Sequence, residues 1–257
     1  MIRVAPRFAE LAAMTNYSFL RGASHPEEMV ARATEIGLNG IGIADRNTLS
    51  GVVRAHVYAR ENRAALGSMR VVVGTRLVFR DGAPDLVVYP ENRAGYGRLC
   101  KLLTKGNLRA EKGECHLDLS DALESAVDLR AIAMPGASRG ERAKLQQLRE
   151  AFGQKLWVGA SLVYGESMRG ALAKRQLLAR EIRSPLIATN DVLMHIPERR
   201  PLADVVACIR EGVTLETAGK LVQANSERYL KDPQEMTRLF AEAPAATEET
   251  LKFLSGI

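Results

Sequence analysis

Short apolar runs alternate along this chain with longer segments in which apolar residues recur at helical spacing. An apolar run of four to eight residues is typical of a buried strand, whereas apolar residues three and four positions apart indicate one buried helix face. Seven strands are predicted, at residues 8–14, 40–44, 69–79, 84–90, 129–135, 155–164 and 185–191. Helices are predicted at residues 24–37, 49–65, 96–104, 139–152, 166–182, 201–210, 233–241 and 247–254.

The first predicted helix has the clearest end signals. Ser24 is a typical N-cap residue and Glu27 follows three positions later, which is the pattern of a capping box. Gly37 is expected to end the helix, because glycine readily adopts the left-handed conformation found there. The expected buried face consists of Met29, Val30, Ala33 and Ile36.

The order of the predicted elements indicates the fold class. Strands that alternate with helices predict βα units around a mostly parallel sheet or barrel. The Asp81-Gly82 pair between two strands indicates a hairpin. Two helices after residue 230 lie outside the alternation, and the chain stops soon after the second, at "FLSGI". This ending suits a fragment of a longer protein as well as a complete one.

Length and composition favour a single intracellular domain. The chain has 257 residues, 46% of them hydrophobic, which is enough for one large core, so one domain over residues 1–257 is expected. Its three cysteines are widely spaced without a CxxC pair, which predicts no disulfide framework and a reducing, cytoplasmic location. No apolar stretch is long enough for a signal peptide or a membrane span, so no membrane partner is expected.

The charge of the chain leaves two interpretations open. A formal net charge of +6 is compatible with a nucleic-acid or phosphate partner. Basic residues gather in helical segments at residues 139–149, 174–183 and 198–201. These segments are either solvated helix faces or contacts to the phosphates of DNA, because phosphate contacts come mainly from lysine and arginine.

Two of the predicted strands end in polar residues. In a parallel βα architecture the ligand site lies at the carboxyl ends of the strands. One strand ends at Asp45, and another ends at Asn190 and Asp191. Two carboxylates that converge there suit a hard metal ion or acid and base chemistry. Alternatively, each aspartate caps the helix or turn that follows its strand.

Three long segments carry a family resemblance. They are residues 15–56, which begin "TNYSFLRGASHPEEM", residues 100–119, "CKLLTKGNLRAEKGECHLDL", and residues 185–219, which begin "PLIATNDVLMHIPERRP". In this order they resemble the N-terminal PHP domain of bacterial C-family DNA polymerases, most closely the error-prone, damage-tolerant branch. The resemblance implies a distorted (β/α)7 barrel at about residues 8–212 and a helical extension at about residues 213–257.

The resemblance also implies a site that has lost its metal ligands. Active PHP domains hold metal ions at the strand ends with His, Asp and Glu, and some hydrolyse phosphate esters or proofread DNA. Asp45 and Asp191 match two of those ligands. Methionine and arginine do not ligate a hard divalent ion, and alanine and leucine offer no donor atom. Five other ligand positions of the family correspond here to Ala12, Met14, Arg46, Arg76 and Leu193.

The matching positions therefore suggest a vestigial strand-end pocket without a catalytic residue, a metal ion or a cofactor. Its expected members are Asp45, Arg46, Arg76, Asn190 and Asp191. Two buried carboxylates need a counter-charge, and a protonated arginine repels a bound cation. We expect the two arginines to neutralise the two aspartates in place of a metal ion.

A rearranged metal site stays open as an alternative. Cys115 and His116 form the one adjacent pair of soft ligands, and His195 follows Asp191 by four residues. Asp191, His195 and Cys115 are the candidates for such a site. The remaining histidines and cysteines are expected in capping, surface or core positions: His25, His56, Cys100 and Cys208.

The resemblance implies a part in DNA replication past damage and in DNA repair. Nucleotidyl transfer in C-family polymerases depends on palm aspartates several hundred residues downstream, so this chain is expected to hold no polymerase active site. The expected role is a scaffold that packs against the other polymerase domains or subunits, with contact to the DNA backbone. The alternatives are a free-standing metal-dependent phosphoesterase with a rearranged ligand set, and an interaction protein left by truncation of a longer gene.

Overall fold

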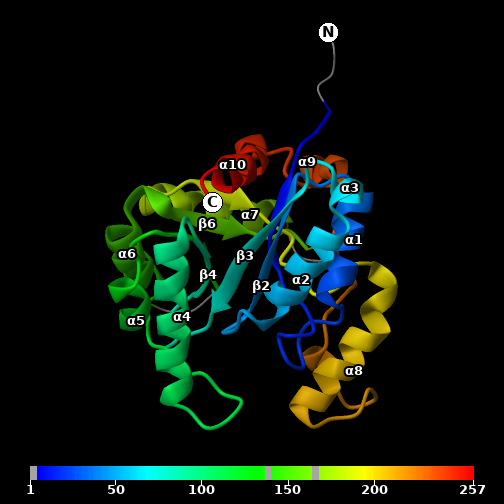
Figure 1. Ribbon diagram of the computed structural model, residues 1–257, viewed down its shortest axis with the longest axis horizontal. Coiled ribbons are helices and arrows are strands. Elements are labelled where there is room, and N and C mark those ends of the chain that lie inside the picture. Colours follow the sequence, from blue (N-terminus) through cyan, green and yellow to red (C-terminus); the bar gives the residue numbers. More distant parts are fainter. Residues whose placement is uncertain (1–4, 137–139, 164–167) are drawn as a thin grey trace.

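The computed structural model describes residues 5–136, 140–163 and 168–257. Its strands form one seven-stranded sheet whose order in space follows the order in the sequence, curled into a half-barrel (Figure 1). The α/β barrel class expected from the sequence is confirmed. The strands are β1 (Ala9–Ala13), β2 (Gly40–Arg46), β3 (Arg70–Leu77), β4 (Asp85–Pro90), β5 (Leu129–Met134), β6 (Leu156–Ala160) and β7 (Leu186–Ala188).

The strands are parallel except at β4. β1, β2 and β3 run parallel to one another, and so do β5, β6 and β7. β4 is antiparallel to both of its neighbours, because the Asp81-Gly82 turn sends the chain back along β3. As a consequence β4 begins where the parallel strands end, and its first residue, Asp85, lies at the carboxyl edge of the sheet.

Main-chain hydrogen bonds draw the two edges of the sheet together at this end. The Val192 N–H donates to the Ala12 carbonyl over 3.1 Å, and the Met14 N–H donates to the Val192 carbonyl over 2.9 Å. Because these residues follow β7 and end β1, the half-barrel is almost closed at the carboxyl ends of its strands.

The helices follow the predicted positions with a few differences. α4 is longer than predicted, α5 was not predicted, and the starts predicted at residues 139 and 166 lie outside the described residues. The helices are α1 (Pro26–Glu35), α2 (Ser50–Glu61), α3 (Arg63–Leu66), α4 (Arg93–Leu108), α5 (Leu119–Glu124), α6 (Glu141–Phe152), α7 (Met168–Glu181), α8 (Arg200–Glu211), α9 (Pro233–Leu239) and α10 (Pro244–Ser255).

The predicted capping box of α1 is wrong by one residue. The N-cap is His25, and the Glu28 carboxylate accepts a hydrogen bond from the His25 N–H over 2.8 Å. Ser24 instead contacts His195 Nδ1 through its hydroxyl over 2.8 Å. The shift follows from Pro26, whose missing N–H suits the first helical position.

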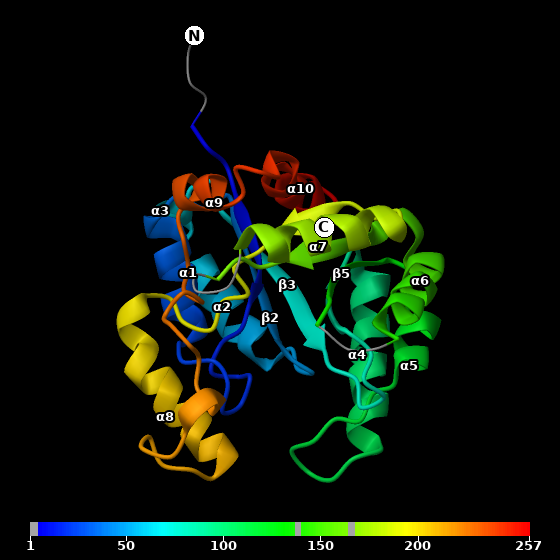
Figure 2. The same ribbon diagram turned by 180° about the vertical axis from the view of Figure 1, so that it is seen from behind.

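The half-barrel is filled by aromatic side chains and closed at one end by α10. Tyr89 crosses the interior and donates its hydroxyl to the Leu11 carbonyl over 2.6 Å. Gly74 leaves room for it, because a Cβ there would lie 2.4 Å from the Tyr89 ring. Phe253 of α10 packs edge-on against Tyr89 and Trp157, with ring centroids 5.5 Å and 4.8 Å apart. Figures 1 and 2 show α9 and α10 at the end where β1 begins.

The opposite end of the half-barrel lies between two projecting helices. α4 and α8 extend past the carboxyl ends of the strands on opposite sides (Figures 1 and 2). The division into a barrel at residues 8–212 and an extension at residues 213–257 stays a prediction. Of the helices in the described ranges, none has both the length and the apolar composition for crossing a bilayer.

Candidate functional site

A cavity of about 410 Å³ opens at the carboxyl ends of the strands. We call it the strand-end cavity. Residues from the ends of all the parallel strands, from the start of β4, and from α7, α8 and the segment after α8 contribute to it. Its lining consists of Met14, Arg21, Arg46, Arg76, Asp85, Met134, Pro135, Gly159, Ser161, Arg175, Asp191, Leu193, Arg210, Gln223 and Arg228.

Asp191 is bound by two arginines in this cavity. Its Oδ1 lies 2.8 Å from Nη1 of Arg76, and its Oδ2 lies 2.6 Å from Nη2 of Arg228. Arg228 Nε also donates to the Asp191 carbonyl over 2.7 Å. Burial alone would raise the pKa of Asp191, but Arg228 and Arg76 hold it below the usual value. The carboxylate is therefore charged and already neutralised by protein groups.

Arg76 is the most deeply buried cation of the cavity. Its side chain is only 7% exposed, and its Nε lies 3.3 Å from the Asp85 carboxylate. Burial lowers the pKa of Arg76, but Asp191 and Asp85 outweigh this effect and raise it. Arg76 thus stays protonated at the centre of a four-membered ion-pair network formed by Asp85, Arg76, Asp191 and Arg228.

Arg46 lines the same cavity but does not neutralise either expected acid. It pairs in register with Arg76 on the neighbouring strand, so the two arginines lie side by side on one face of the sheet. Burial lowers the pKa of Arg46, and the neighbouring Arg76 and Arg210 lower it further, while Asp85 opposes them. No ion pair or side-chain hydrogen bond of Arg46 is found in the part of the chain that the structure describes.

Asp45 lies outside the cavity and is bound by hydroxyl groups. Its Oδ1 accepts from the Thr15 N–H and the Ser18 hydroxyl, both over 2.7 Å, and its Oδ2 accepts from the Thr15 hydroxyl over 2.8 Å. Gly51 of α2 lies against this carboxylate, since a Cβ there would come within 2.2 Å of Oδ2. Burial raises the pKa of Asp45 despite these hydrogen bonds.

The expectation that the two arginines would neutralise Asp45 is therefore wrong. Successive residues of a strand point to opposite faces of the sheet, so Asp45 and Arg46 cannot share one environment. Asp45 faces the layer of α1 and α2, together with Ile43, whereas Arg46 faces the interior of the half-barrel.

Asn190 also points away from the cavity. Its side-chain amide donates to the Glu227 carbonyl over 2.8 Å, and its Oδ1 lies 3.3 Å from Lys231 Nζ. Its main-chain N–H donates over 2.7 Å to Glu10, a fully buried carboxylate that also accepts from the Thr189 hydroxyl over 2.5 Å. Burial raises the pKa of Glu10. Glu10 was missed from the sequence, although it is the one charged residue in an otherwise apolar strand.

The residues of the alternative metal site do not come together. His195 contacts Ser24, whereas the Cys115 thiol lies 3.9 Å from the Leu103 carbonyl of α4. In residues 5–136, 140–163 and 168–257, no group of three or more His, Cys, Asp or Glu side chains is placed to hold a metal ion. The donor set does not fit a PHP-type metal centre either, because Arg76 takes up one oxygen of Asp191.

Several charged residues of the cavity were not predicted. Asp85 could have been found, because a hairpin after β3 places the first residue of the next strand beside the other strand ends. Arginines from outside the sheet carry no such signal, because tertiary packing alone brings their loops and helices to the cavity. These residues are Arg21, Arg175, Arg210 and Arg228.

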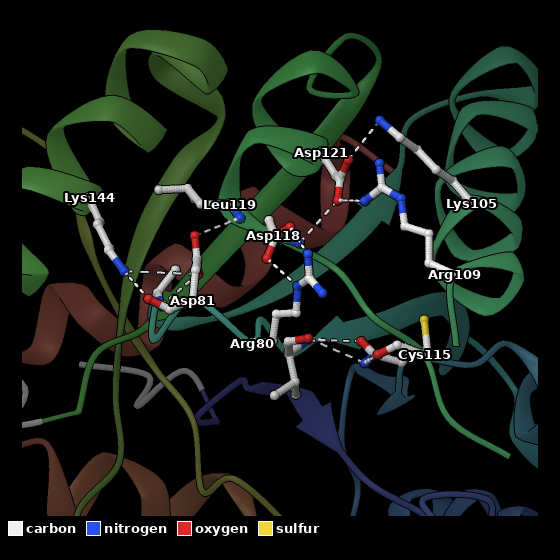
Figure 3. Close-up of polar contacts among 12 residues, drawn as sticks. Arg80, Asp81, Lys105, Arg109, Cys115, Asp118, Leu119, Asp121 and Lys144 are labelled. Carbon is white, nitrogen blue, oxygen red and sulfur yellow. Dashed lines mark hydrogen bonds and ion pairs between the residues drawn. The ribbon is translucent and has the colours of Figure 1, made fainter. Parts of the chain in front are cut away.

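A second group of charges lies between α4, α5 and the end of β3 (Figure 3). Asp121 is at its centre, 2.6 Å from Lys105 and 2.7 Å from Arg109. Burial alone would raise the pKa of Asp121, but the Asp118 N–H, Lys105 and Arg109 lower it to about 2. We call this group the α5 cluster; its members are Arg80, Asp81, Lys105, Arg109, Asp118, Asp121, Glu124 and Lys144.

Sequence comparison connects this geometry with known proteins. The family model described as PHP domain matches residues 10–160. An error-prone DNA polymerase of Rhodopseudomonas palustris (strain BisB5) is 46% identical over 98% of this chain. Error-prone DNA polymerase 1 of Rhizobium meliloti (strain 1021) is 48% identical over 96% of it. The chain spans only 23% and 22% of the length of these two relatives.

Solved structures agree on the fold. A crystal structure of a putative metal-dependent phosphoesterase from Bifidobacterium adolescentis covers 73% of this chain and 88% of its own, with a TM-score of 0.52 and 12% identity. An amidohydrolase from Chromobacterium violaceum with bound sulfate and no metal covers 72% of this chain and 87% of its own, with a TM-score of 0.53 and 15% identity. With the family model matching more than half of its length, the chain belongs to the PHP domain family.

Proposed function

We propose that this chain is the PHP module of an error-prone DNA polymerase and serves there as a structural scaffold without a hydrolytic reaction of its own. Identity of 46–48% to error-prone polymerases over nearly the whole chain supports the polymerase setting. Because the chain spans less than a quarter of those relatives, other domains would carry nucleotidyl transfer and would be its partners. Synthesis past DNA damage, DNA repair and a cytoplasmic location belong to the same proposal.

The observation that carries the scaffold role is the Arg76–Asp191 ion pair. A guanidinium group 2.8 Å from Asp191 stands beside the carboxylate where a divalent cation would bind in a metal-dependent relative. Arginine stays protonated, so it repels a metal ion and at the same time supplies the positive charge that the carboxylate needs. The strand ends are thereby held together without a metal ion.

Contact with the DNA backbone is proposed at the same end of the module. A groove of about 890 Å³ runs beside the strand-end cavity, and Arg21, Arg46, Arg80 and Arg210 are among its lining residues. Arginines along a groove suit the sequence-independent binding of phosphates.

A metal-dependent phosphoesterase is the second candidate. It is favoured by the likeness in fold to the Bifidobacterium protein, which is described as a putative metal-dependent phosphoesterase. Two observations count against it. His195 and Cys115 have different partners, and Asp45 already accepts from two hydroxyl groups and a main-chain N–H.

Metal content and hydrolysis separate the two functions. The purified chain is incubated with zinc or manganese, freed of unbound ions and analysed by elemental mass spectrometry, and hydrolysis of bis(p-nitrophenyl) phosphate is followed in parallel. The scaffold predicts well below one ion per chain and no hydrolysis above the buffer rate. One or more tightly held ions, lost in Asp191→Asn but kept in the control Asp118→Asn, together with hydrolysis, would replace the scaffold by the phosphoesterase.

A further inference from the structure

The strand-end cavity holds more positive charge than its own residues neutralise. Its charged lining consists of six arginines and two aspartates, a formal excess of four positive charges. Buried or half-buried charges of one sign repel one another strongly, because the surrounding protein screens them less than water does. Part of this excess is balanced by an acid next to the lining, because Glu211 pairs with Arg210 over 2.8 Å.

Arg21 and Arg46 carry the part of this excess that has no partner. Arg76 and Arg228 share Asp191, whereas no ion pair or side-chain hydrogen bond of Arg21 or Arg46 occurs in the described ranges. Burial lowers the pKa of both arginines, and neighbouring arginines lower it further: Arg46 and Arg210 act on Arg21, and Arg76 and Arg210 act on Arg46. Asp85 acts in the opposite direction on both without outweighing these effects.

Arg76 contributes an unused donor to the same cavity. Its Nε is buried and has no hydrogen-bond acceptor among the described residues, although the Asp85 carboxylate lies 3.3 Å away. A buried donor without an acceptor costs free energy, which a ligand oxygen would recover. The cavity thus combines unpaired positive charge with an unsatisfied buried donor, and the same network leaves one buried acceptor, Asp191 Oδ1, without a hydrogen-bond donor among the described residues.

The chemistry of these groups selects the class of ligand. Guanidinium groups match oxyanions, with two parallel N–H donors to each phosphate or carboxylate group. A volume of about 410 Å³ lies within the range of about 300–1,000 Å³ that is typical of small-molecule sites. We propose that the strand-end cavity binds a small anion that carries phosphate groups, with Arg21 and Arg46 as its main contacts and without a metal ion.

The ligand has a route into the cavity. Arg21, Arg46 and Arg210 line both the strand-end cavity and the wider groove of about 890 Å³ beside it. An anion in the groove therefore meets the two unpartnered arginines first, and the deeper Arg76 lies behind them at 7% exposure.

Calorimetric titration of the 257-residue chain tests the proposal. Inorganic phosphate, inorganic diphosphate and a deoxynucleoside triphosphate are titrated separately in buffer that contains EDTA, so the result does not depend on metal ions. We expect one anion per chain, tighter binding of diphosphate than of phosphate, and weaker binding as the salt concentration rises. A triphosphate that binds more tightly than diphosphate assigns a nucleotide as the ligand, and equal affinities assign a free diphosphate.

Two variants and one matched control locate the site. Arg21→Gln and Arg46→Gln should each weaken diphosphate binding by roughly tenfold to a hundredfold, the effect of losing charge-assisted hydrogen bonds. Arg80→Gln removes an arginine that lines the groove but not the cavity and is paired with Asp118, so it should leave the affinity unchanged. Thermal unfolding and circular dichroism verify that each variant is folded.

Three results would overturn the proposal. The first is a folded chain that binds none of the three phosphate compounds. The second is an equal loss of affinity in Arg46→Gln and Arg80→Gln, because this would indicate unspecific attraction to positive charge. The third is citrate binding as tightly as diphosphate, because this would assign the cavity to carboxylates.

Discussion

The strand-end cavity and the α5 cluster are two groups of charges with opposite balance. The α5 cluster contains four cations and four acids, and each of them has a partner of opposite sign: Arg80, Lys105, Arg109 and Lys144 against Asp81, Asp118, Asp121 and Glu124. The strand-end cavity sets six arginines against two aspartates.

The difference separates a structural network from a candidate binding site. A balanced network needs no further ion, and most of its cations are exposed, as Arg80 is at 59%. The cavity keeps unbalanced charge in a partly enclosed space, where Arg76 is only 7% exposed. Counting partners, rather than counting charges, therefore indicates where this molecule would accept an anion.

The largest effect is expected at Asp191. Asp191→Asn removes the carboxylate that neutralises Arg76 and Arg228, and it should lower the free energy of unfolding by roughly 3–5 kcal/mol, the usual cost of breaking a buried ion pair. The control, Asp118→Asn, breaks an exposed pair with Arg80 and should cost less than about 1 kcal/mol. Urea unfolding measures both, and equal losses would remove the distinction between the two regions.

A smaller effect is expected outside the cavity, at Ser18. Ser18→Ala deletes a donor to the buried Asp45 and the acceptor of the Arg46 N–H, and it should cost roughly 1–3 kcal/mol at neutral pH. The deficit should shrink as the pH falls below the pKa of Asp45, which burial raises, because the protonated acid needs fewer donors. Ser50→Ala is the control, since its exposed hydroxyl contacts Thr48 alone among the residues that the structure describes. A pH-independent deficit would mean that Asp45 is not charged in the folded chain.

Removal of an unpaired charge should change the free energy of unfolding still less, and in the opposite direction. Arg46→Gln relieves repulsion with Arg76 and should raise the free energy of unfolding by up to about 1 kcal/mol at low salt. Arg80→Gln, which removes one partner of an exposed ion pair, should lower it by less than about 1 kcal/mol. Thermal unfolding in a buffer without phosphate shows whether each of the two variants is stabilised or destabilised. Destabilisation by Arg46→Gln would show that Arg46 has a partner.

A change that appears only in acid concerns the α5 cluster. Asp121 has its pKa lowered from 3.8 to about 2, so its stabilising effect is fully present above about pH 4 and is lost as the pH falls toward 2. The stability of Asp121→Asn should therefore change less than that of the wild-type chain over this interval. Carboxyl NMR titration measures the pKa directly, and an ordinary value would contradict the ion pairs with Lys105 and Arg109.

The fold and the ends of its strands could be predicted because both depend on local patterns. Apolar runs fix where each strand stops, so Asp45 and Asp191 were placed at the carboxyl edge from the sequence alone. The face on which Asp45 lies could not be predicted. Strands of a parallel sheet are apolar on both faces, so their sequence does not tell which face is inside.

The partners of the cavity residues could not be predicted from the sequence either. Arg228 lies 37 residues from Asp191 along the chain, and it reaches that carboxylate only because the segment after α8 folds back over the strand ends. α5 was missed because it has six residues, too few for a helical pattern of apolar positions to be visible. In both cases long-range packing rather than local preference decides the structure.

The most direct measurement is a pair of anomalous difference maps from crystals of the chain soaked separately in tungstate, an oxyanion of phosphate-like shape, and in manganese. An anion site predicts a tungsten peak between Arg21 and Arg46 and no manganese peak beside Asp45 or Asp191. A manganese peak at the two aspartates, with no tungsten in the strand-end cavity, would contradict it.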